Sequence, residues 1–149
     1  MSSGRLRMLL GAAVRRRADL GPLVRALWLL PWTTARLRGR RGSAVAQGAA
    51  VGHGERAVDA RQLARARRLQ RVVAIASAHG VATGTCLSRS LTLLDLLQRE
   101  RLPAALRIGV RGTGGDLEAH AWVECAGVVL NDAPDVADRY AAFAAGARR

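Results

Sequence analysis

Lysine is absent from this sequence: all 24 basic residues are arginines, and with 11 acidic residues they give a formal net charge of +13. Such an excess of cations favours acidic partners, among them nucleic acid, anionic lipid and acidic peptides. The arginines are spread over predicted helices, however, and no aromatic or glycine pattern of an RNA- or DNA-binding fold accompanies them. A nucleic-acid-binding module is therefore kept only as an alternative, and we expect no nucleic acid among the partners.

Cysteine is scarce as well. The two cysteines, Cys86 and Cys125, lie 39 residues apart, outside any CxxC motif. Two such residues make neither a disulfide scaffold nor a zinc site. The sequence therefore predicts a protein of the reducing cytoplasm.

Long hydrophobic runs are also missing. The best apolar stretch, "ALWLLPWTTA" at 26–35, is half of the roughly 20 residues that a membrane-spanning helix needs. The "RRR" at 15–17 and the "AVA" at 44–46 resemble parts of an export signal, but Arg25 and the charged "RLRGRRG" interrupt the uncharged stretch that such a signal requires. We therefore predict neither a membrane span nor a secretion signal.

The first third of the chain carries helical periodicity. Residues 5–41 are rich in arginine, and their apolar positions recur at helical spacing, which predicts one or two amphipathic helices with Pro22 near a helix start. The glycine-rich "GSAVAQGAAVGHG" at 42–54 predicts a loop or linker. We accordingly divide the chain into residues 1–54 and a core of residues 55–149, expected to form a single compact unit.

Two more helices and then strands are predicted in that core. Apolar residues recur at helical spacing in 55–79 and 85–99, whereas 105–112 and 117–124 alternate between apolar and polar residues, as strands do. "VVLND" at 128–132 predicts a third strand. The fold class is therefore α+β, with N-terminal helices followed by a small antiparallel sheet.

The stretch "TGTCLSRSLTLLDLL" at 83–97 places Cys86 at the mouth of a helix, ahead of its leucine stripe. Thr85 is a good N-cap residue, so Cys86 would occupy the first helical position. There the free N–H groups and the helix dipole favour a thiolate, which is the nucleophilic form. We predict Cys86 as a nucleophile, although a lone cysteine is as often a packing residue.

A base and an orienting group follow on the predicted sheet. His120 is the candidate base, and Asp132, twelve residues on, is the candidate partner that fixes its tautomer. A three-residue hairpin loop at 125–127 would place these two residues opposite each other on one face, with Gly127 at the position that needs a positive φ. Asn131 is a rival orienter, but in that register it points to the other face.

Each residue also has a purely structural interpretation. His120 taken alone fits a hydrogen-bonded strand histidine, and Asp132 could simply cap the turn before Pro134. Cys125 is predicted to pack or to lie in a loop, His79 to end a helix, and His53 to have no specific role. The order of a cysteine at a helix start, a histidine on a strand and an aspartate on the next strand is more specific for a catalytic site than any one of the three residues.

That order is typical of the transglutaminase-like, papain-related cysteine enzymes. The segments "TCLSRSLTLLDLLQRERLPAALRIGVRG" and "LEAHAWVECAGVVLND" further resemble the B2 proteins of lasso-peptide biosynthesis, over about residues 55–143. The resemblance implies a transglutaminase-like core in which Cys86 is the nucleophile, His120 the general base and acid, and Asp132 the orienting residue. It implies a peptidase that removes the leader from a ribosomally made precursor and needs no metal or cofactor.

The resemblance also implies partners. They are the leader–core precursor peptide, a separate B1-type leader-recognition protein, since this chain has no room for such a domain, and the lasso cyclase that uses the freed amine. The arginine-rich N-terminal helices could dock such a partner, an acidic leader or the inner membrane face, or could merely be solvated. The main rival activity is another transglutaminase-like acyl transfer or deamidation, for which the same three residues would serve.

Overall fold

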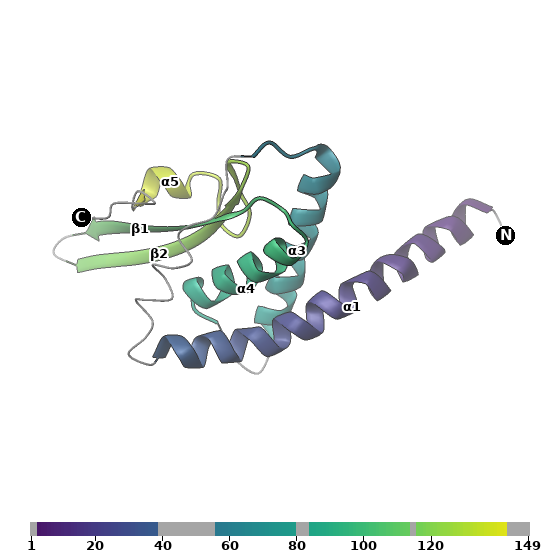
Figure 1. Cartoon of the computed structure of the whole chain (residues 1–149), viewed down its shortest axis with the longest axis horizontal. Coiled ribbons are helices and arrows are strands. Elements are labelled where there is room, and N and C mark those ends of the chain that lie inside the picture. The colour runs from purple at the N-terminus through teal and green to yellow at the C-terminus, as the bar shows by residue number, and fades with distance from the viewer. Residues whose placement is uncertain (1–2, 39–55, 80–83, 114–115, 143–149) are drawn as a thin grey trace.

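The computed structural model describes residues 3–38, 56–79, 84–113 and 116–142, and it confirms the α+β class. Three helices come first: α1 (Ser3–Arg38), α3 (Ala60–His79) and α4 (Cys86–Arg99). The strands β1 (Ala105–Thr113), β2 (Asp116–Cys125) and β3 (Val128–Val129) follow, and then α5 (Val136–Arg139) and β4 (Ala141–Ala142). Figure 1 shows α1 and α4 on one side of the long β1–β2 hairpin and α5 on the other.

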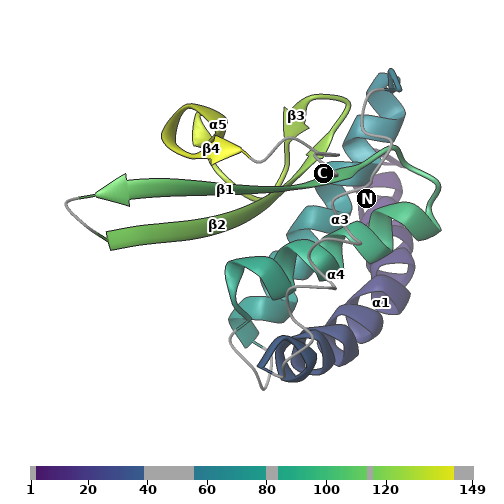
Figure 2. The ribbon, with the colours of Figure 1, turned by 60° about the vertical axis from the view of Figure 1, so that its left-hand side comes forward.

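The four strands form an antiparallel sheet in the order β3-β2-β1-β4. Figure 2 shows α1, α3 and α4 against one face of this sheet and α5 against the other. The short strand β4, which the sequence pattern did not indicate, pairs with β1 through Gly109 and Val110. The chain after β3 therefore returns across the outer face of the hairpin to its far edge.

The main core lies between the sheet and α4. It is built from aliphatic side chains, as the low aromatic content requires, with Leu93, Leu97, Leu106 and Val123 almost fully buried. The leucine stripe of α4 thus does what its spacing predicts: it packs α4 against β2 on one side and against α1 and α3 on the other. Burying such a side chain stabilises the fold by about 1.5–3 kcal/mol.

Helix α1 is one continuous helix that runs through Pro22 and Pro31, so the placement of Pro22 near a helix start is wrong. Proline keeps a helical φ and removes one backbone hydrogen bond, a loss that packing can offset. The packing here comes from Ala26 and Leu30, which belong to the main core. Arg25 also pairs with Asp95 of α4 at 2.9 Å.

The opposite face of α1 is uncovered by the residues that the structure describes. It exposes an apolar stripe formed by Leu20, Val24, Leu27, Trp28 and Trp32, and Arg36 lies over the ring of Trp32. None of the helices in the described ranges has the length and apolar character needed to cross a bilayer. The predicted linker at 42–54 lies outside the described residues.

The β2–β3 turn corrects the predicted register. The hairpin pairs Cys125 with Val128 and Glu124 with Val129, so the loop has two residues, Ala126 and Gly127, instead of three. Both have a positive φ, of 50° and 79°, which is the backbone of a type I′ turn. The positive φ predicted for Gly127 is confirmed, but the pairing of His120 opposite Asp132 is wrong.

Candidate active site

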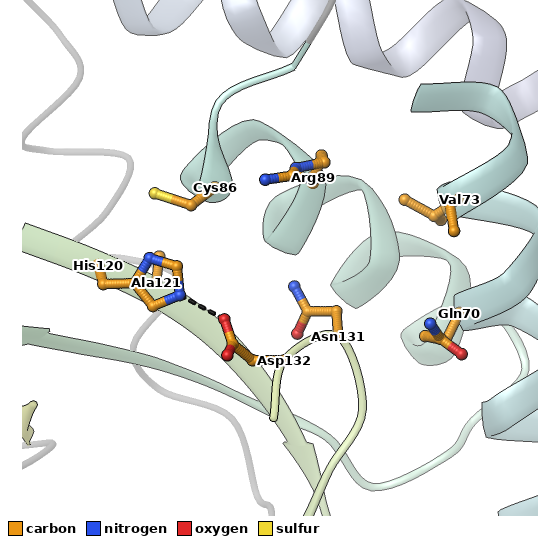
Figure 3. A pocket seen from close by; sticks show the side chains of 9 residues that line it. Gln70, Val73, Cys86, Arg89, His120, Ala121, Asn131 and Asp132 are labelled. Atoms are coloured by element: carbon orange, nitrogen blue, oxygen red, sulfur yellow. Dashed lines mark hydrogen bonds and ion pairs between the residues drawn. The ribbon is translucent and has the colours of Figure 1, made fainter. Parts of the chain in front are cut away.

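A small cavity of about 80 Å³ opens at the start of α4, where that helix meets α3, β2 and the chain after β3. Figure 3 shows the side chains around it. The cavity is lined by Gln70, Val73, Ala74, Cys86, Arg89, His120, Ala121, Asn131 and Asp132. The three residues predicted from the sequence, Cys86, His120 and Asp132, are thus brought to one place.

Cys86 is the first residue of α4, and Thr85 is its N-cap, as predicted. The Thr85 hydroxyl accepts a hydrogen bond from the backbone N–H of Ser88 at 3.2 Å. A thiol at this position lies beside backbone N–H groups that have no partner within the helix. Cys86 is half-buried, so a substrate can reach its sulfur.

The start of α4 is also held from α1. A Cβ added at Gly84 would come within 2.8 Å of Ser88 Oγ and 3.0 Å of Leu30 Cδ2. Glycine therefore lets the chain enter α4 directly beneath α1. The sequence left the N-terminal helices as a docking element or as solvated faces, whereas Leu30 of α1 here lies close to the residue two positions before Cys86.

His120 lies on β2 with its Nε2 2.5 Å from Asp132 Oδ2. Asp132 binds Nε2. The second ring nitrogen, Nδ1, is therefore available to another partner. Figure 3 shows Cys86 above the imidazole and Asp132 at its other edge. The side chains of His120 and Asp132 are each 20% exposed, which leaves the pair shielded but within reach of the cavity.

The environment keeps Asp132 charged. Burial alone would raise the pKa of this carboxyl, but the hydrogen bonds from His120 and from the Ala133 N–H, with the charges of His120 and Arg139, outweigh it and lower the pKa below 3.8. Arg139 Nη2 donates to Asp132 Oδ1 at 3.1 Å. An anionic partner of this kind fixes the imidazole tautomer and stabilises the imidazolium form.

Asp132 reaches His120 because β3 ends early. The side chain of Asn131, rather than a strand carbonyl, accepts a hydrogen bond from the Val123 N–H at 2.8 Å. Strand alternation therefore stops after Leu130, and Asn131 and Asp132 both face the cavity. The expectation that Asn131 points to the other face is wrong, although Asp132, and not Asn131, bonds to the histidine.

Ser90 is the residue of this site that sequence reasoning missed. Its hydroxyl is fully buried, donates to the Ala121 carbonyl at 3.0 Å and accepts from Asn131 Nδ2 at 2.8 Å. Ser90 thereby ties α4 to β2 and to the chain that carries Asp132. Its position one helical turn after Cys86, on the same face of the helix, is the signal that could have found it.

The remaining cysteine and histidines lie elsewhere. Cys125 is fully buried in the main core, and burial raises the pKa of its thiol. The prediction that it packs is confirmed. His79 is exposed at the end of α3, and His53 lies outside the described residues.

Comparison with known protein families identifies the superfamily of the chain. Residues 26–145 match the transglutaminase-like superfamily, which is most of the chain, and the protein belongs to this family. The matched range starts within α1, so the family relationship includes part of that helix.

A curated relative extends the comparison. The microcin J25-processing protein McjB of Escherichia coli is 39% identical over 59 residues, which make up 40% of this chain and 27% of that protein. This similarity and the family match support the resemblance to the lasso-peptide B2 proteins. No solved structure matches the chain.

Proposed function

We propose that this protein is a cysteine peptidase that removes the leader from a ribosomally made lasso-peptide precursor. The observation that carries the proposal is the arrangement of the cavity, where Cys86 at a helix start shares one site with the hydrogen-bonded pair of His120 and Asp132. A cysteine, a base and an orienting carboxylate are the groups that thiol-based acyl transfer requires. The similarity to McjB, named for processing microcin J25, favours a precursor peptide as substrate.

The proposed reaction has two steps. The Cys86 thiolate attacks the scissile carbonyl, and the His120 imidazolium gives its proton to the departing amine of the core peptide. The leader then remains on Cys86 as a thioester. Neutral His120 removes a proton from water, the hydroxide attacks the thioester, and the thiolate leaves as the leader is released with a new carboxylate.

Two other groups complete this scheme. Asp132 holds Nε2 of His120, so that Nδ1 faces the sulfur and the imidazolium is stabilised while it forms. The backbone N–H of Cys86, which lies at the first position of α4, is our candidate donor to the oxyanion. The chemistry needs no metal or other cofactor.

We propose three partners for this reaction. The first is the precursor peptide, and the second is a separate B1-type recognition protein that presents the leader. The third is the cyclase that consumes the freed amine of the core. All three are compatible with a location in the cytoplasm, where the thiol stays reduced.

Another acyl transfer is the second candidate. The same three residues could pass the acyl group to an amine, or could hydrolyse a side-chain amide, because only the acceptor or the donor differs. The geometry of the site is equally compatible with peptide hydrolysis and with these two reactions. Product analysis therefore decides between the candidates.

The test is mass spectrometry of the cognate precursor after incubation with this protein and the recognition protein. We expect one cut at the junction of leader and core, which Cys86→Ala abolishes and the matched variant Cys125→Ala retains. A mass increase of the precursor without cleavage would favour transfer to an amine, and a gain of about one mass unit would favour deamidation. An intact, unmodified precursor would contradict the proposal.

A further inference from the structure

Residues 132–142, which we call the C-terminal segment, touch His120 at both ends. Asp132 opens the segment and bonds to the imidazole edge, while Tyr140 near its end stacks on the imidazole face, with ring centroids 4.9 Å apart and an interplanar angle of 29°. We propose that Tyr140 is a positioning residue that fixes the plane of the His120 ring. The proposal rests on the peptidase function argued above, but it can be tested without it.

Tyr140 is itself held firmly. It is 5% exposed and forms a small second core with Trp122 and Val136 on the outer face of the sheet. Its hydroxyl donates to Glu118 Oε1 at 2.8 Å. A ring that is packed on its sides and bonded at its tip has little freedom, so it can constrain the ring against which it lies.

Arg111 adds a second restraint from β1. Its guanidinium pairs with Glu118 and lies over the Tyr140 ring, 5.0 Å from the centroid. The hydrogen bonds from Tyr140 and then from Arg111 lower the pKa of Glu118, which agrees with a carboxylate that binds both. Arg111, Glu118 and Tyr140 thus form one linked group around the outer side of His120.

The backbone leaves room for this stack at Gly109, the residue of β1 that pairs with His120. A Cβ added at Gly109 would lie 2.9 Å from Tyr140 Cβ and 3.0 Å from the Trp122 ring. A glycine in the middle of a strand marks such a close approach. At this position any other residue would displace Tyr140 or Trp122.

The consequence for His120 follows from the number of its restraints. The bond to Asp132 fixes one edge of the imidazole but allows the ring to rock about that bond. Stacking on Tyr140 removes this motion and keeps Nδ1 directed to one place. Misplacing a reacting group by 1 Å can lower a rate by about 100-fold.

The experiment compares three variants: Tyr140→Leu removes the ring, Tyr140→Phe keeps it without the hydroxyl, and Val136→Ala weakens the same small core without touching His120. The readout is the NMR relaxation of the His120 ring signals, which reports motion of the imidazole, together with the rate at which iodoacetamide alkylates Cys86. Neither readout needs the precursor. Cleavage of the precursor is measured in parallel.

We expect Tyr140→Leu to increase the motion of the His120 ring and to slow alkylation of Cys86 by about 10-fold, with a similar or larger loss in cleavage. Tyr140→Phe should restore both to within about threefold of the original protein. If Val136→Ala, at matched loss of thermal stability, increased the motion of the His120 ring as much as Tyr140→Leu does, Tyr140 would have only a packing role.

Unchanged motion of the His120 ring in folded Tyr140→Leu would also overturn the proposal. Failure of the peptidase function gives a different result. The original protein would then leave the precursor intact, while the ring motion and the alkylation rate would still separate Tyr140→Leu from Val136→Ala.

Discussion

Cys86 is held by its neighbours in the sequence, whereas His120 is held by residues 12 and 20 positions away. The Thr85 cap and the first turn of α4 place the sulfur through hydrogen bonds that span three or four residues. The imidazole instead depends on Asp132 and Tyr140, both carried by the C-terminal segment that crosses the outer face of the sheet. One half of the site is therefore a local motif and the other half a product of the tertiary fold.

This difference predicts how strongly mutations in each half of the site should affect activity. Local motifs tolerate change because α4 is supported along its whole length by core packing. The histidine half depends on single contacts, any of which can be lost without unfolding the helices. The predictions that follow test this contrast, from the largest expected effect to the smallest.

Replacement of the base should have the largest effect. We expect His120→Ala to lower kcat/KM for precursor cleavage by about 10³–10⁴-fold, because both proton transfers pass through this side chain. Initial-rate kinetics with the recognition protein present measures the loss. His79→Ala, which changes an exposed histidine at the end of α3, is the matched control and should leave the rate unchanged.

The orienting carboxylate should come next. Asp132→Ala should cost about 10²–10³-fold in kcat/KM, and Asp132→Asn should recover part of it because an amide oxygen can still accept from Nε2. If Asp132→Ala retained full activity, the histidine would not depend on this contact.

The same residue predicts a pH dependence of stability. The pKa of Asp132 is lower in the folded protein than its ordinary value of 3.8, so the carboxylate stabilises the fold above that value. This contribution is lost as the pH falls through the lowered pKa. Thermal unfolding between neutral and acidic pH should thus show a smaller acid loss in Asp132→Asn than in the original protein, and equal losses would contradict the assignment.

Loss of the buried link should have a moderate effect. Ser90→Ala leaves the partly buried Asn131 Nδ2 without this hydrogen-bond partner, which costs about 1 kcal/mol of stability and loosens the chain that carries Asp132. We expect a drop of about 10-fold in cleavage. Thr92→Ala removes another buried hydroxyl of α4, bonded only to the Ser88 carbonyl, and should lower stability with little effect on cleavage.

The smallest effect should come from the local half. Thr85→Ala removes the N-cap of α4 and should cost about 1 kcal/mol of unfolding free energy. Because core packing keeps α4 in place, cleavage should fall only a few-fold. A loss as large as that of Asp132→Ala would show that the cysteine half is the more fragile one.

The contrast also explains which features could be predicted from the sequence. Local periodicity and capping residues predict the α+β class, the bounds of α4, its Thr85 cap and the long β1–β2 hairpin, and these predictions are confirmed. Cys86, His120 and Asp132 were chosen from residue type and chain order, and the structure brings them to one cavity.

The failures have a common physical origin in contacts that leave no local pattern. The register after β2 was wrong because the side chain of Asn131 takes the place of a strand carbonyl, which no alternation of apolar residues reveals. A proline usually favours a helix start, and the prediction for Pro22 fails because α1 packs on the core through residues whose contacts leave no local sequence pattern. Strand β4 has two residues, too few for any period.

The most direct test of the central claim is the intact mass of the protein, quenched in acid within its first turnovers of the cognate precursor and its recognition partner. The account predicts an adduct on Cys86 with the mass of the free leader less one water, present in the original protein and in Cys125→Ala and absent in Cys86→Ala. Release of leader by Cys86→Ala, or cleavage by the original protein with the thioester mapped to another residue, would contradict it.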